Sequence, residues 1–149
     1  MTAALNIYTR GIAANPSEGL YYRRALIYRG KEDFHRALDD MDRALGLSPV
    51  DIVISNERLL LLIQMRKTEQ AGKELNELNS LGMDARGRIF ALCGISLENH
   101  DFSQAANLLE IGRKSVPSQV FEQMLKNPVI ARHQMRPEIM PFYFGNISP

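Results

Sequence analysis

Apolar residues occur along this chain in a series of blocks with helical spacing, and turn-forming residues separate the blocks. The breaks fall at residues 15–17, 30–32, 48–49, 67–68, 82, 100–101 and 117–118. They contain Pro, Gly or short polar runs, which interrupt helices. The pattern predicts helices over residues 2–14, 18–30, 34–46, 52–66, 68–81, 86–99, 102–115 and 118–126. The predicted N-caps are Ser17, Asp51, Thr68, Asp101 and Ser118.

One small residue recurs at the same place in every second block. The alanines are spaced by 33, 34 and 34 residues: Ala4, Ala37, Ala71 and Ala105. A large side chain follows each alanine by four positions: Tyr8, Met41, Leu75 and Leu109. Twelve positions after each alanine stand Pro16, Pro49, Met83 and Pro117. A fixed period of this length is typical of an array of helix pairs.

This pattern resembles the tetratricopeptide repeat, which has an aromatic, a small residue and a tyrosine on a first helix, then alanine, a large residue and proline on a second. The best copy is Tyr21, Ala25, Tyr28, Ala37, Met41, Ala44 and Pro49. The copy over residues 86–117 substitutes Ile89, Cys93, Ser96 and Gly112 at marker sites, and the copy between them carries Ser55, Leu59 and Leu62. The resemblance implies an all-α fold, a right-handed superhelical solenoid of antiparallel helix pairs.

The repeat divides the chain into a series of segments. We predict a half repeat over residues 1–16, full repeats over 17–49, 50–83 and 84–117, and a capping helix over 118–127. Residues 128–149 form a tail rich in proline and aromatic residues, whose composition is not that of a disordered linker.

The resemblance also implies a concave groove, lined by the first helix of each repeat and used for binding. The matching positions are Tyr22, Arg23, Leu26, Arg29, Asn56, Glu57, Leu60, Ile63, Gln64, Phe90, Ala91, Gly94, Leu97 and Glu98. Leu60 and Ile63 have an alternative interpretation as core residues of a degenerate repeat. The family's clamp for a peptide carboxylate is missing, because its sites hold Tyr22, Leu26, Glu57, Gly87 and Ala91. An apolar or aromatic ligand segment suits these residues better.

The tail is a candidate ligand within the same chain. Phe142, Tyr143 and Phe144 carry enough apolar surface for docking on the chain's own solenoid or on that of a neighbouring copy. The alternative is that these three residues extend the cap of the core.

Composition narrows the class of protein. The 149 residues, 45% of them apolar, suffice for one domain with a sizeable core. Because 18 basic residues balance 17 acidic ones, we expect no nucleic-acid partner. The longest apolar run, residues 59–63, is far shorter than the roughly 20 residues of a membrane helix, so no membrane insertion is expected. The lone Cys93 and a start without the features of a secretory signal predict a cytoplasmic location.

Residues with catalytic or metal-binding chemistry are scattered. His35, His100 and His133 lie far apart in sequence, and Cys93 occupies a helix-contact site where we expect an inert buried thiol. The acidic residues of 39–42 lack the glycine of a calcium loop and predict a solvated acidic face. No phosphate loop, nucleophile elbow or paired-histidine motif occurs, so we expect no enzyme activity, cofactor or metal.

Together these observations predict a protein–protein interaction module, an adaptor or chaperone-like protein that binds a partner peptide or protein in its groove. The alternative is a self-assembly module, a homo-oligomer whose tail docks on its own or a neighbouring solenoid.

Overall fold

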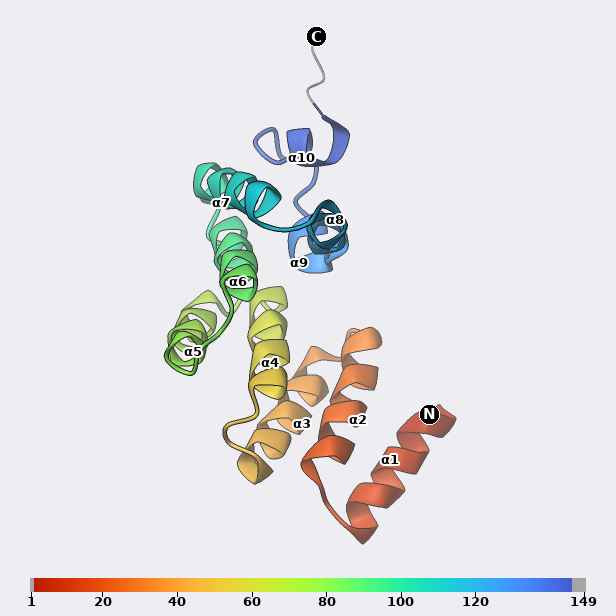
Figure 1. Cartoon of the computed structure of the whole chain (residues 1–149). Helices are drawn as coiled ribbons and strands as arrows, with labels where there is room; N and C mark the ends of the chain where they lie inside the picture. Colours follow the sequence, from red (N-terminus) through yellow and green to blue (C-terminus); the bar gives the residue numbers. More distant parts are fainter. Residues whose placement is uncertain (1, 146–149) are drawn as a thin grey trace. The chain divides into compact units, whose positions relative to one another are not determined.

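The computed structural model describes residues 2–145, and over that range it consists of ten helices and no strand (Figure 1). The helices are α1 (Ala3–Ala14), α2 (Glu18–Gly30), α3 (Phe34–Leu47), α4 (Ile52–Gln64), α5 (Thr68–Ser80), α6 (Ala85–Glu98), α7 (Phe102–Ser115), α8 (Ser118–Lys126), α9 (Pro128–Ala131) and α10 (Met140–Phe144). Consecutive helices pack against each other, as in α2 with α3 and α6 with α7. The all-α fold predicted from the sequence is therefore confirmed, while the handedness of a superhelix stays a prediction.

The helix caps explain most of the boundaries. Ser17, Asp51 and Asp101 accept hydrogen bonds from the backbone amides of Leu20, Ile54 and Gln104, at 3.3, 3.1 and 3.1 Å. The N-caps predicted at Thr68 and Ser118 were wrong, because each is the first residue of its helix. The caps there are Lys67 and Pro117, which make no side-chain capping bond.

The same type of turn follows the three helices α2, α4 and α6. Glu32, Arg66 and His100 are 34 residues apart, and each adopts a left-handed backbone conformation with φ of 59°, 59° and 61°. In each turn the following amide donates to the carbonyl five residues earlier, on Tyr28, Leu62 and Ser96, at 2.9, 2.9 and 2.8 Å. This is the hydrogen bond of a Schellman helix end. The backbone conformation of these turns therefore recurs with the same 34-residue period as Ala37, Ala71 and Ala105.

The chain divides into two compact units, residues 1–61 and 62–149, called unit 1 and unit 2 below. In unit 1, the α2–α3 contact buries Ala25, Ala37, Met41 and Ala44 completely. Asp40 is also buried, and Arg24 of α2 donates to both of its carboxylate oxygens at 2.7 and 2.8 Å. The prediction of a solvated acidic face was wrong at this residue, because the ion pair joins the two helices.

In unit 2, α6 and α7 form the corresponding pair. Cys93 is fully buried and its thiol lies 3.7 Å from the carbonyl oxygen of Ala105. Ile89 on α6 approaches Gly112 of α7, where an added Cβ would lie 3.6 Å from its side chain. The fully or nearly fully buried residues also include Leu97, Leu109, Val129, Ile130 and Ile139, so the core of unit 2 extends into the predicted tail.

Within residues 2–145, none of the helices has both the length and the apolar character that crossing a bilayer requires.

Candidate protein-binding surfaces

The predicted groove positions of unit 1 form a partly exposed surface on α2 and α4. Tyr22, Leu26 and Arg29 follow one another by four and three residues, so they share one side of α2. They are half-buried, as are Asn56, Glu57 and Leu60 on α4, whereas Arg23 is exposed. We call the residues Tyr22, Leu26, Arg29, Asn56, Glu57 and Leu60 the α2–α4 surface.

An ion pair joins the two helices of this surface. The Arg29 guanidinium donates a hydrogen bond to the Glu57 carboxylate, and both side chains keep about a quarter to a third of their area exposed, 31% and 25%. Burial raises the pKa of the Tyr22 phenol, as does the negative charge of Glu57, while Arg29 opposes the shift. The phenol, the guanidinium and the carboxylate therefore lie within electrostatic reach of one another.

The corresponding positions of unit 2 are covered. Phe90 and Leu97 on α6 are 9% and 0% exposed, and the Glu98 side chain is 3% exposed. They were predicted to line an open groove, and in the described structure they do not. The physical reason is that α9 packs against α6.

Gly94 makes this contact sterically possible. A Cβ on residue 94 would lie 2.6 Å from Cγ1 of Val129 and 3.1 Å from Cγ2 of Ile63, closer than van der Waals contact allows. Val129 and Ile130 are 1% and 0% exposed. Asn127 starts α9 by accepting a hydrogen bond from the Val129 amide at 3.0 Å, and Pro128 occupies the first helical position, which suits proline.

A charged cluster fixes the end of the same segment. The buried Glu98 carboxylate accepts a hydrogen bond from Arg132 and lies 2.8 Å from Nε2 of His133. Arg66 lies 3.4 Å from the other carboxylate oxygen. Arg132 also donates to the carbonyl oxygens of Ile63 and Gln64, both at 3.2 Å. Residues 127–133, called the docked segment below, are thus held by apolar, ionic and backbone contacts.

The sequence indicated only part of this cluster. The sequence analysis assigned Gln64, Gly94 and Glu98 to the predicted groove. It did not assign Arg132 or His133 to any site. The only signal for them in the sequence was the adjacent pair Arg132 and His133 shortly after the Asn127-Pro128 break.

The aromatic tail also packs within the chain. Phe142 meets Phe121 of α8 edge to face, with ring centroids 6.4 Å apart, and the Tyr143 hydroxyl donates to the Leu125 carbonyl at 2.6 Å. Burial raises the pKa of Tyr143 to about 12, with a further contribution from Cys93. Phe144 differs from these two residues, since half of its surface is exposed. Residues 146–149 of the predicted tail lie outside the described residues.

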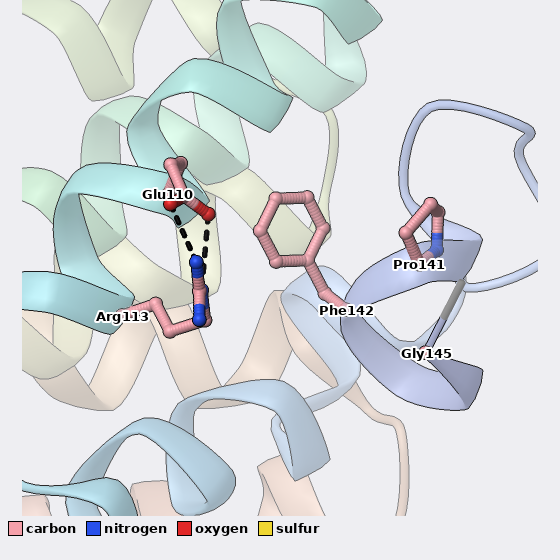
Figure 2. Close-up of a pocket in the computed structure, with 5 residues that line it drawn as sticks. All are labelled: Glu110, Arg113, Pro141, Phe142 and Gly145. Carbon is pink, nitrogen blue, oxygen red and sulfur yellow. Dashed lines mark hydrogen bonds and ion pairs between the residues drawn. The ribbon is translucent and has the colours of Figure 1, made fainter.

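A pocket opens where α10 approaches α7 (Figure 2). Its lining consists of Glu110, Arg113, Pro141, Phe142 and Gly145. Arg113 donates to both carboxylate oxygens of Glu110 at 3.0 and 2.6 Å, which lowers the pKa of Glu110 and leaves both charges satisfied. The pocket therefore offers no unpaired charge to a ligand.

The cysteine and the histidines do not form a catalytic or metal-binding group within residues 2–145. Burial raises the pKa of the Cys93 thiol to about 12, so it is not a nucleophilic thiolate at neutral pH. His35 and His100 are exposed, whereas His133 belongs to the Glu98 cluster. Among residues 2–145, no three His, Cys, Asp or Glu side chains gather in a way that could hold a metal ion.

The fold and these surfaces define an all-α protein built of packed helix pairs with a self-docked C-terminal segment. A scan against models of protein families found no match, and a search of curated proteins found no similar sequence.

Proposed function

We propose that this protein is a protein–protein interaction module of the tetratricopeptide class, which holds a peptide or protein segment against the first helix of its repeats. The 34-residue recurrence of the turn residues Glu32, Arg66 and His100 supports the class. The docked segment carries the functional proposal, because on α6 the positions that the sequence predicts for a groove bind a short segment of the same chain. In this account the protein is an adaptor or chaperone-like factor rather than an enzyme, and a cytoplasmic location stays a prediction.

The α2–α4 surface is the site that we assign to the partner. Tyr22, Leu26 and Leu60 provide half-exposed apolar area, and burying such side chains is what drives association. The Arg29–Glu57 pair adds donors and acceptors at one place on the surface, which fixes the direction of a bound segment. A partner segment with apolar or aromatic side chains and at least one backbone or side-chain polar group beside this pair fits the surface.

Site-specific photo-crosslinking tests this assignment. A benzophenone amino acid replaces Tyr22 in one variant and Phe144 in the other, because both are aromatic residues with accessible surface. After irradiation in native extract, we expect the probe at position 22 to form an adduct with a partner protein that the probe at 144 does not capture. The absence of any specific adduct at position 22 would refute the proposal.

Self-assembly is the second candidate, and one observation favours it. Phe144 is 52% exposed and Met135 is 67% exposed, so part of the apolar tail is uncovered. In that case the probe at position 144 would crosslink to a second copy of the chain, and the mass measured by light scattering would be a multiple of 16.9 kDa.

A further inference from the structure

One cavity of unit 2 is lined mainly by cationic side chains. It lies at the end of the docked segment, has a volume of about 220 Å³, and is lined by Arg132, His133, Met135 and Arg136. Because roughly 10–15 Å³ suffices for one water molecule, the cavity has room for a polyatomic ligand. None of its four lining residues is acidic, whereas the pocket beside α10 contains Glu110 paired with Arg113. We call it the basic cavity.

The guanidinium of Arg136 has no acceptor among residues 2–145. It lies over the face of the Phe102 ring, 4.6 Å from the ring centroid, and this cation–π contact holds the group in place. No carboxylate or carbonyl oxygen within the same range accepts a hydrogen bond from the Arg136 side chain. Its fork of N–H donors is therefore available to a ligand in the cavity.

The ion pairs around the cavity leave an excess of positive charge. The buried Glu98 carboxylate is the acidic partner of Arg66, Arg132 and His133, and its two oxygens contact all three. No other acidic side chain of residues 2–145 pairs with these groups or with Arg136. Three guanidinium groups and one carboxylate leave two positive charges uncompensated, even when His133 is neutral. The cluster therefore attracts an anion.

We propose that the basic cavity binds a dianionic phosphate monoester. Such a group carries a charge of about −1.5 to −2 at pH 7, which matches the two uncompensated positive charges. Its oxygens suit the planar donor fork of Arg136, which can hold two of them at once. Met135 is 67% exposed and provides an apolar contact for the group that is esterified to the phosphate. The site is separate from the α2–α4 surface of unit 1.

Calorimetric titration of the full chain with phenyl phosphate tests the proposal. The titration is made at about pH 7.5 and low ionic strength, where screening of the charges is weak. We expect saturable binding with a Kd below about 1 mM. Phenyl sulfate has the same ring but only one negative charge, and it should bind at least about tenfold more weakly.

Three protein variants locate the binding. Arg136→Gln removes the free guanidinium and should weaken the binding of phenyl phosphate by at least about tenfold. Arg136→Lys keeps the charge but loses the fork, so its affinity should be intermediate. Arg88→Gln is the matched control, because it removes a positive charge from an exposed position elsewhere in unit 2 and should leave the Kd unchanged. Equal helix content and equal unfolding midpoints establish that the variants fold alike.

A phosphate monoester can come from a small metabolite or from a phosphorylated side chain, and a second probe distinguishes these sources. A short peptide with phosphoserine between alanines binds more tightly than phenyl phosphate if the ligand is a phosphorylated side chain, and more weakly if it is a metabolite. In both cases Arg136→Gln should lose the binding.

Four results would overturn the proposal. The first is no saturable binding of either phosphate probe at millimolar concentration, and the second is equal affinity of the wild type and Arg136→Gln. The third is an equal loss in Arg88→Gln, because net charge alone would then attract the anion. The fourth is equal affinity for phenyl sulfate and phenyl phosphate, because the site would then not select a dianion.

Discussion

The first helices α2 and α6 occupy the same place in the repeat, yet the positions predicted to line a groove remain partly exposed on α2 and are covered on α6. Two residue differences account for this. Leu26 on α2 corresponds to Gly94 on α6, 68 residues later, and Gly30 corresponds to Glu98. Gly94, which has no side chain, leaves a notch on α6 that receives Val129, and the Glu98 carboxylate supplies the charge that pairs with Arg132. On α6 the positions predicted to line a groove bind the chain's own segment, because they have both the space and the countercharge.

The largest effect is expected when the notch is closed. Gly94→Ala introduces a Cβ that overlaps Val129, and we expect the free energy of unfolding to fall by about 2–3 kcal/mol because the docked segment must shift. Urea denaturation measures this change. Gly72→Ala in α5 is the matched control, since no atom lies within 4 Å of its new Cβ, and it should raise stability by about 0.5–1 kcal/mol. A Gly94→Ala variant as stable as the wild type would show that the notch is not needed.

Removal of the countercharge should have the next largest effect. Glu98→Gln removes the charge of the buried carboxylate and leaves Arg132 without this partner, and we expect a loss of about 2 kcal/mol together with faster amide exchange in residues 128–133. Hydrogen-exchange mass spectrometry measures the second effect. Glu110→Gln removes a carboxylate from an exposed ion pair of the same unit and should leave exchange in that segment unchanged.

A smaller effect is expected from the tail. Tyr143→Phe deletes the hydrogen bond to the Leu125 carbonyl and should lower the free energy of unfolding by about 1 kcal/mol at pH 7. Because burial raises the Tyr143 pKa to about 12, above its ordinary value near 10, the contribution of the phenol is complete below pH 10 and disappears between pH 10 and 12. The stability difference between the two proteins should therefore shrink over that window in urea titrations. A difference that grows with pH would contradict the assignment.

The smallest effect concerns the repeated turn. Glu32 is exposed and adopts a φ of 59°, so Glu32→Gly relieves a left-handed conformation and should raise the free energy of unfolding by up to about 1 kcal/mol. Thermal denaturation measures the change. The neighbouring exposed Lys31 has an ordinary φ of −93°, and Lys31→Gly should not stabilise the protein.

The sequence predicted the helices well because their spacing is local information. The eight predicted helices match α1 to α8 to within two residues at each end. The short helices α9 and α10 were missed, because Pro128 and Pro141 indicate breaks as readily as the first turn of a helix.

The candidate site was only partly predictable. Gly94 and Glu98 were placed on the correct side of α6 by the repeat, but their burial depends on the path of residues 127–133, which carry no repeat signal. Phe90 and Leu97 were therefore expected to be accessible, and they are not. Arg132 could not be assigned from the sequence, because its partners Ile63, Gln64 and Glu98 lie 34 to 69 residues away.

We propose that a partner protein binds the α2–α4 surface of unit 1 while the docked segment keeps the α6 positions occupied. Calorimetric titration of the partner captured at position 22 into the wild type, Tyr22→Ala and Glu98→Gln tests it most directly. We predict that Tyr22→Ala weakens the affinity by at least about tenfold and that Glu98→Gln leaves it unchanged. Unchanged affinity for Tyr22→Ala together with tighter binding to Glu98→Gln would contradict the account, because the partner would then compete with the docked segment on α6.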